Sequence, residues 1–159
     1  MANTTIPATS SELAARVDAG WRPFREAVRG LGRARLDERT PAGWSYHDLI
    51  AHVAAWEELT ARRLRTLHES GDRTEPEAAA DAFNAHVVAT HRLVGAEALL
   101  DELDTAHRSL LAALEGLSDD EVAAEVQETP WGPASWVVAI VAGNTYGHYA
   151  EHAAELEAA

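Results

Sequence analysis

Gly147-His-Tyr-Ala-Glu-His152 is a short segment within a longer apolar-periodic run, Ala134 to Leu156, that predicts a helix. His148 and His152 are four residues apart, so they lie one turn apart on the same helical face. Two imidazoles at this separation can chelate one divalent metal ion. A chain with eight histidines also produces such pairs by chance, so the pair needs a third ligand before it indicates a metal site.

The composition is typical of one all-α domain. The chain has 159 residues, of which 47% are hydrophobic, and this is enough for one complete core. Ala, Leu, Val, Glu and Arg dominate, and most Gly and Pro residues fall between the periodic segments. We therefore expect a single domain over residues 1–159, with residues 1–9 disordered or extended.

The charged residues and the missing residue types exclude several classes of function. The formal net charge of −13 argues against nucleic acid or an anionic membrane as a partner. All 13 basic residues are Arg and the chain has no Cys, which excludes a Schiff-base lysine, a thiolate nucleophile, a disulfide and Cys-ligated zinc. No signal-peptide pattern is present, and the longest uncharged apolar run, Ala134 to Ala142, is too short to span a bilayer. We expect a cytoplasmic protein that acts on a small molecule.

Apolar periodicity predicts four long helices and a long connection between the second and the third. Pro23 lies inside the first helix and predicts a kink or break near Gly20–Trp21. The second helix should begin at Ser45, where Asp48 completes a capping box, and end at Gly71. Expected helices span Ser11–Leu31, Ser45–Gly71, a short helix within Glu77–Val94, Glu97–Leu117 and Ala134–Leu156.

The region before the last helix carries two further local signals. Ser118 with Glu121 forms a second capping box that opens one or two turns up to Val126. Residues 128–133 should then form a loop, with Pro133 close to the first turn of the last helix.

His52 is the candidate third ligand. It lies in the apolar stripe of the second helix, one turn from both Leu49 and Trp56, so it is either a buried core histidine or a metal ligand. It lies roughly 9 Å from the start of its helix, and the pair His148 and His152 averages about 10 Å from the end of theirs. The three histidines therefore lie at the same height along the bundle axis, at one level, only if the second helix and the last helix are antiparallel.

The long connection after the second helix indicates whether the second and last helices run parallel or antiparallel. Such a crossover lets helices two and three run parallel, and a hairpin then makes helices two and four antiparallel. The sequence thus predicts a four-helix bundle with a long crossover between helices two and three, and a metal site at His52, His148 and His152. The alternative is that these histidines are buried or exposed without any ligand role.

Other polar residues near these histidines have two interpretations each. Asp48 could orient the His52 ring, or it could only cap its helix. Asn144 could contact substrate or an imidazole, or it could be a buried amide bonded to a neighbouring helix. Trp56 and Trp131 could form the wall of a pocket at the level of His52. We expect the carboxylates Glu57 and Glu151 to be solvated charges, and the remaining histidines to be surface or core polar residues: His47, His68, His86, His91 and His107.

The sequence resembles the DinB/YfiT-like superfamily of metal-binding four-helix bundles over essentially its full length. The resemblance is carried by Gly43-Trp-Ser-Tyr-His-Asp-Leu-Ile-Ala-His52, by the His148-x3-His152 motif with the following Ala-Ala-Glu-Leu156, by the loop Thr129–Pro133 and by the run Asn144–Tyr149. This resemblance implies that His52, His148 and His152 bind a divalent metal, zinc or nickel.

Two branches of this superfamily imply different activities. Members similar to the N-terminal domain of mycothiol-dependent maleylpyruvate isomerase use the metal to hold a low-molecular-weight thiol such as mycothiol, although those isomerases place a carboxylate where this chain has His148. Members similar to ClbS and DfsB look like metal-independent hydrolases of a reactive natural product, in which His148, Asn144 and Tyr149 would act on the substrate directly.

The resulting hypotheses differ in class. The first is a metal-dependent enzyme for detoxification or self-protection. It would either transfer a thiol to a small electrophile or hydrolyse that electrophile. Because the chain has no Cys, any thiol would have to be a cosubstrate. The alternatives are a ClbS-like hydrolase without metal and a non-enzymatic protein that sequesters a small molecule. The resemblance also suggests a homodimer.

Overall fold

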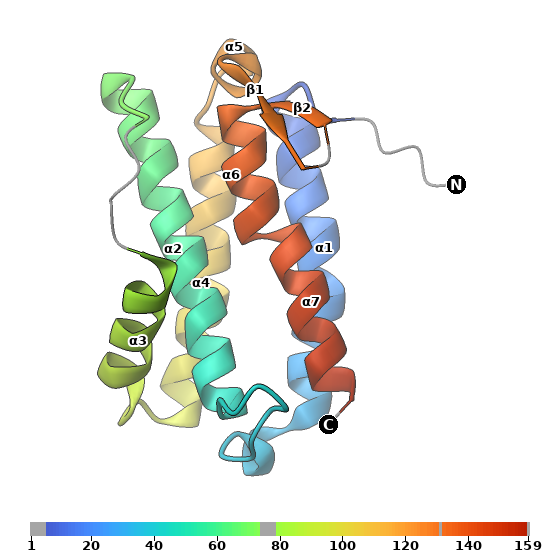
Figure 1. Ribbon diagram of the computed structural model, residues 1–159, viewed down its shortest axis with the longest axis vertical. Coiled ribbons are helices and arrows are strands. Elements are labelled where there is room, and N and C mark those ends of the chain that lie inside the picture. The colour runs from blue at the N-terminus through green and yellow to red at the C-terminus, as the bar shows by residue number, and fades with distance from the viewer. Residues whose placement is uncertain (1–5, 74–78, 131, 159) are drawn as a thin grey trace.

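The protein is a bundle of long helices with one small hairpin. The computed structural model describes residues 6–73, 79–130 and 132–158 (Figure 1). The helices are α1 (Ser10–Leu31), the short 3-10 helix η1 (Arg33–Arg35), α2 (Tyr46–Ser70), α3 (Ala80–His91), α4 (Ala96–Glu115), α5 (Asp119–Ala123), α6 (Trp136–Asn144) and α7 (Tyr146–Glu157). Strands β1 (Val126–Thr129) and β2 (Gly132–Ser135) pair in antiparallel fashion. The predicted all-α bundle is confirmed.

Local signals in the sequence fix where several helices begin. Ser45 accepts a hydrogen bond from the Asp48 amide, and the Asp48 carboxylate accepts one from the Ser45 amide, both at 3.0 Å. This is a complete capping box, as the sequence predicted. The second predicted box, at Ser118 and Glu121, is also present and opens α5. Gly71 ends α2 in the left-handed conformation, which glycine adopts without steric cost.

The directions of the helices agree with the predicted crossover. Figure 1 shows that α2 and α4 run in the same direction, with α3 along the outer side of α2. The last two helices, α6 and α7, run antiparallel to α2. The start of the predicted connection, within residues 74–78, lies outside the described residues.

The last predicted helix is in fact two helices. We expected one helix over Ala134–Leu156, but it begins at Trp136 and is interrupted at Thr145, whose φ of −130° and ψ of −105° are not helical. The Thr145 hydroxyl donates to the Val141 carbonyl at 2.6 Å, a side-chain bond back to the preceding turn of α6. Asn and Thr are weaker helix formers than Ala or Leu, so local propensity did not oppose an interruption here.

Two further predictions were wrong in whole or in part. The break predicted near Gly20–Trp21 does not occur, because burial of the apolar side chains of α1, including Trp21 and Phe24 on either side of Pro23, outweighs the lost backbone hydrogen bond. The kink, the other alternative, stays a prediction. Residues 128–133 were predicted as a loop, but Glu128 pairs with Pro133 and Thr129 pairs with Gly132 between β1 and β2. Pro133 lies in β2, and the α6 cap is Ser135. Gly and Pro are loop signals, which is why the short hairpin was not predicted.

The core runs the length of the bundle and is formed by apolar faces of all the long helices. Its fully buried members include Phe24, Ile50, Leu64, Leu103 and Val141. Within the described part of the chain, no helix combines the length and the hydropathy that crossing a membrane requires.

Candidate metal centre

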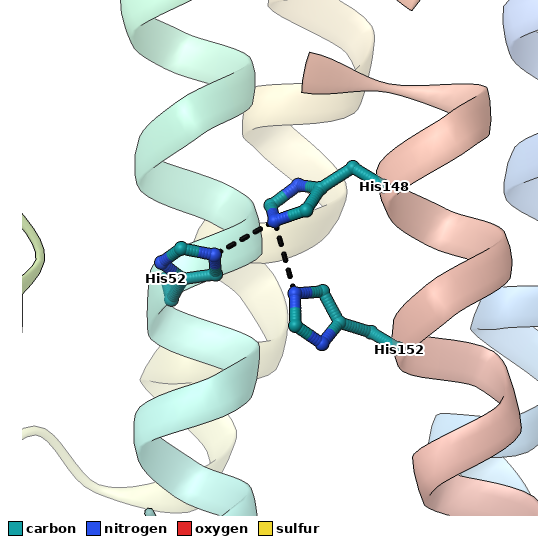
Figure 2. A group of neighbouring side chains, drawn as sticks. All are labelled: His52, His148 and His152. Atoms are coloured by element: carbon teal, nitrogen blue, oxygen red, sulfur yellow. Dashed lines mark hydrogen bonds between the residues drawn. The ribbon is translucent and has the colours of Figure 1, made fainter. Parts of the chain in front are cut away.

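Three histidines from two antiparallel helices converge between α2 and α7. His52 comes from α2, and His148 and His152 come from α7 (Figure 2). The Nε2 atom of His148 lies 2.7 Å from that of His52 and 2.9 Å from that of His152. Candidate ligand atoms of the three residues all lie within 4.8 Å of one another. The arrangement places at one level the three residues that the sequence analysis selected.

The orientation of the His52 ring is fixed by its other nitrogen. Asn84 Oδ1 lies 3.0 Å from Trp56 Nε1 and 3.0 Å from His52 Nδ1. An indole N–H can only donate, so the atom that faces it must be the amide oxygen. His52 Nδ1 therefore also donates to that oxygen, and the lone pair of His52 Nε2 points toward α7. Fixing the tautomer of a ligand histidine in this way is typical of metal sites.

A carboxylate orients His152 in the same manner. Its Nδ1 lies 3.1 Å from Glu155 Oε1, one turn later on α7. Since an ionised carboxylate only accepts, His152 Nδ1 donates, and in the neutral form of the ring the lone pair is then on Nε2. Without a metal ion, a proton on His148 Nε2 could be donated to His52 Nε2 or to His152 Nε2, but not to both. A divalent cation would accept all three lone pairs, so the donor set fits a metal ion.

Burial keeps the His52 and His148 imidazoles neutral, as metal ligands must be. Loss of hydration lowers the pKa of His52 to about 4, with a further contribution from nearby His152. The same cause lowers the pKa of His148 to about 3, and the neighbouring His152 and His52 add to the effect. Both rings are therefore uncharged at neutral pH, and the nitrogen without a proton can donate its lone pair to a cation.

Asp48 and Asn144, the predicted secondary contacts, have partners other than the imidazoles. Asp48 caps α2 at Ser45, and the His52 nitrogen it was considered to orient bonds to Asn84 instead. The side-chain amide of Asn144 donates to the Thr60 hydroxyl at 3.1 Å, so it ties α6 to α2.

Two tryptophan rings pack against His52. The Trp44 ring packs edge-on against His52 with 5.0 Å between centroids, and the Trp56 ring lies 6.2 Å away. Trp56 thus contacts the His52 ring, whereas its predicted role in the wall of a pocket stays a prediction. Trp131, the other wall candidate, lies outside the described residues.

Tyr149 does not face the three histidines although it follows His148 directly. Its side chain is fully buried in the core, and its hydroxyl donates to Glu57. Glu57 was expected to be a solvated charge, and this was wrong: it is 0% exposed and also accepts a hydrogen bond from His107 Nδ1 at 3.0 Å. Burial raises the pKa of the Glu57 carboxyl, against the lowering effect of its His107 and Tyr149 hydrogen bonds.

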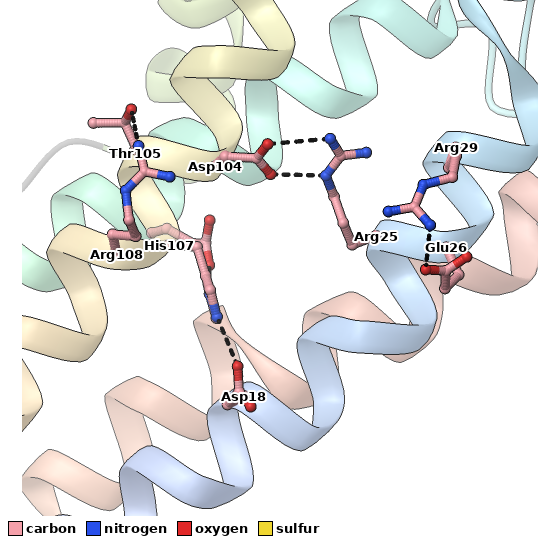
Figure 3. A network of polar contacts seen from close by, with 9 residues as sticks. Asp18, Arg25, Glu26, Arg29, Asp104, Thr105, His107 and Arg108 are labelled. Carbon is pink, nitrogen blue, oxygen red and sulfur yellow. Dashed lines mark hydrogen bonds and ion pairs between the residues drawn. The ribbon is translucent and has the colours of Figure 1, made fainter.

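The polar network continues from this buried pair toward the surface of the bundle. Figure 3 shows His107 reaching Asp18 on α1, with Nε2 and Oδ1 3.5 Å apart, and Arg25 pairing with Asp104 through two contacts. The Trp21 ring stacks on His107 at 4.1 Å between centroids. This network links α1, α2, α4 and α7 and is separate from the three-histidine cluster.

Sequence reasoning missed two residues that orient the histidines. Glu155 follows His152 by three residues, and this helical spacing could have identified it. Asn84 lies 32 residues from His52 on a helix whose position was unknown, so no local pattern pointed to it.

Most of this chain matches one known domain family. Residues 17–151 match the family described as the mycothiol maleylpyruvate isomerase N-terminal domain. No curated protein matches the chain.

Solved structures share the fold at low sequence identity. The colibactin self-resistance protein ClbS, solved in complex with a dsDNA, superposes with a TM-score of 0.77 at 15% identity, covering 97% of this chain and 96% of that one. The sibling lethal factor precursor DfsB gives 0.72 at 14% identity and 94% coverage of both chains. A mycothiol-dependent maleylpyruvate isomerase gives 0.73 at 19% identity, covering 92% of this chain but 60% of the isomerase.

The match to the domain family covers most of the chain, and the helical bundle with its crossover agrees with it. The chain belongs to the mycothiol maleylpyruvate isomerase N-terminal domain family, within the DinB/YfiT-like superfamily of helical bundles.

Proposed function

We propose that the protein is a divalent-metal-dependent enzyme that transfers a thiol to a small electrophilic compound or hydrolyses it. One observation carries the proposal: three imidazole Nε2 atoms converge, and two of them are held in the metal-binding tautomer by Asn84 and Glu155. His52, His148 and His152 would hold zinc or nickel.

Three neutral protein ligands leave room for a further ligand, which is characteristic of catalytic rather than structural metal sites. When bound, the ion would lower the pKa of a coordinated water to near 7 or deprotonate a coordinated thiol. The chain has no Cys, so the thiol would be a cosubstrate. The family match suggests mycothiol as a candidate.

Residues around the three histidines orient the imidazole rings and exclude part of the water from the site. Asn84 and Glu155 hold two rings with their lone pairs toward the cluster. Trp44 and Trp56 cover one side of His52, whose side chain is buried. Removing water in this way strengthens electrostatic interactions at the site.

A metal-independent hydrolase is the second candidate, because ClbS and DfsB share the fold over nearly the whole chain. That mechanism would use His148, Asn144 and Tyr149. The burial of Tyr149 and its bond to Glu57 remove one of these three from contact with a substrate. The geometry therefore favours the metal-dependent candidate.

Elemental analysis of protein purified without a histidine tag tests the proposal. We expect about one equivalent of zinc or nickel per chain, as a three-histidine site would bind. His152→Ala should reduce the content below about half an equivalent. His86→Ala, which removes an exposed histidine of α3, is the matched control and should retain the metal. Wild-type protein without metal, or full occupancy in His152→Ala, would contradict the proposal.

Turnover assays then separate an enzyme from a sequestering protein. Thiol addition to 1-chloro-2,4-dinitrobenzene and hydrolysis of p-nitrophenyl acetate should be measured with and without a low-molecular-weight thiol. We expect activity that requires metal and is lost in His148→Ala. Stoichiometric binding without turnover would support sequestration instead.

A further inference from the structure

A pocket lies beside the candidate metal centre, where α6 meets α7. Its volume is about 410 Å³, which suits a compact organic ligand. His148 forms part of its wall. The apolar part of the wall comes from two places, the segment before α1 and buried side chains of α6: Ile6, Pro7, Val138 and Ala142.

The interruption at Thr145 shapes this pocket. α7 starts offset from the end of α6 at this break (Figure 1). Gly143 and Gly147 line the pocket on either side of it. A Cβ atom built on Gly143 would meet no atom within 4 Å, so the space above this residue is open. The hollow therefore exists because the helix breaks and because glycine occupies its surface.

The two sides of the pocket differ in charge. On the α1 side, the Arg16 guanidinium lies over the Tyr146 ring, 5.2 Å from its centroid. His148, two residues after Tyr146, lines the same pocket from α7. Glu151, one turn after His148, is also in the wall. An anionic group is therefore favoured near Arg16 and disfavoured near Glu151.

We propose that this pocket binds a molecule with an apolar body about the size of one to three rings and one anionic group. The anion lies toward Arg16, and the opposite end of the ligand lies toward His148. Volume, apolar wall and charge asymmetry each point to this class. That the ligand is the substrate rests on the proposed function, whereas binding in the pocket does not.

The first test fills the pocket. The probe is 1-anilinonaphthalene-8-sulfonate, an apolar anionic dye whose fluorescence rises on binding. Gly143→Leu should weaken dye affinity by about tenfold or more, because its side chain occupies the open space. Gly30→Leu is the matched control, since Gly30 is also helical and has no atom within 4 Å of a built Cβ. Equal dye affinity in Gly143→Leu and wild type would overturn the proposal.

The second test examines the charge. Arg16→Gln should weaken binding of the sulfonate dye by roughly tenfold, the effect of losing one charge-assisted contact. Binding of the uncharged N-phenyl-1-naphthylamine should not change. Equal losses for both dyes would show that Arg16 does not select an anion, and this part of the proposal would fail.

A third measurement links the pocket to the metal centre and separates the two proposals. Cobalt(II) added to the wild type should quench the bound dye, and His152→Ala should prevent this. If cobalt does not bind but both dye tests succeed, the pocket stands and the metal-dependent function fails. If cobalt binds and Gly143→Leu leaves the dye in place, the metal centre stands and the pocket proposal is overturned.

Discussion

Asn84 shows how a single residue can determine what the histidine cluster does. Its carboxamide oxygen receives hydrogen bonds from both Trp56 and His52, each at 3.0 Å. The indole fixes the orientation of the amide, and the amide in turn fixes the tautomer of the imidazole. The ring nitrogen available to a metal is thus decided by a residue that does not itself belong to the cluster.

Replacing this residue should weaken metal binding without removing a ligand. Asn84→Ala should reduce zinc affinity by about 10- to 100-fold, because orienting partners of ligand histidines have effects of this size. Competition with a chromophoric chelator would measure the affinity. Asp81→Ala, which changes an exposed residue of the same helix, is the control and should bind zinc as the wild type does. Unchanged affinity in Asn84→Ala would argue against the orienting role.

The lowered pKa values predict how pH affects the stability of the metal-free protein. The pKa values of His52 and His148 are about 4 and about 3 in the folded chain, against an ordinary histidine value of 6.5. Between these values the unfolded chain binds more protons, so stability should fall as pH drops below about 6.5. The slope is at most about 1.4 kcal/mol per pH unit for each histidine.

Urea unfolding in the presence of a chelator, between about pH 5 and pH 7, would measure this slope. His148→Gln should give a shallower dependence, because one of the two titrating groups is gone. The same slope in both proteins would show that His148 does not contribute.

At the scale of helices, the contact between α1 and α7 depends on close approach at one glycine. A Cβ atom added to Gly20 would lie 2.7 Å from Tyr146 Cβ and 3.2 Å from its Cα. Since backbone atoms cannot yield as a flexible side chain can, the two helices would have to move apart. The position of α7, which carries two of the histidines, is therefore tied to a small residue on α1.

Gly20→Ala should destabilise the protein by about 1–3 kcal/mol through overpacking. This runs against the helix preference for Ala over Gly, which is about 0.5–1 kcal/mol. Gly30→Ala in the same helix has open space around it and should be neutral or stabilising. Thermal unfolding of both variants would measure the difference, and a stabilised Gly20→Ala would refute the close-packing argument.

At the scale of the molecule, the buried Glu57 network joins the main helices. It links Asp18 on α1 through His107 on α4 to Glu57 on α2 and Tyr149 on α7. Breaking a buried polar network is costly because the remaining partners stay desolvated. The network therefore helps to fix the spacing of α2 and α7, the two helices that carry the histidines.

Tyr149→Phe removes one donor to Glu57 while preserving the ring. We expect a loss of about 1–3 kcal/mol in the free energy of unfolding. Tyr46→Phe, a change at another buried tyrosine, serves as the comparison and should cost less. A double-mutant cycle with Glu57→Gln should show coupling between the two sites. Additive effects would mean that the hydrogen bond contributes little.

The expected single domain over residues 1–159, the homodimer and the absence of nucleic-acid binding stay predictions. Size-exclusion chromatography with light scattering would address the oligomer. A relative solved with dsDNA makes a DNA-binding measurement worthwhile despite the net charge of −13.

The amino-acid sequence by itself determined the helical bundle, the caps at Ser45 and Ser118 and the common level of His52, His148 and His152. The helices and their caps follow from periodicity and spacing, which are local properties, and the common level follows from the long connection that makes helices two and four antiparallel. Only the tertiary structure decided which residues orient the histidines, that α6 and α7 are separate, and that Glu57 is buried. Its partners His107 and Tyr149 are 50 and 92 residues away, and a carboxylate can be buried only where folding brings such donors to it.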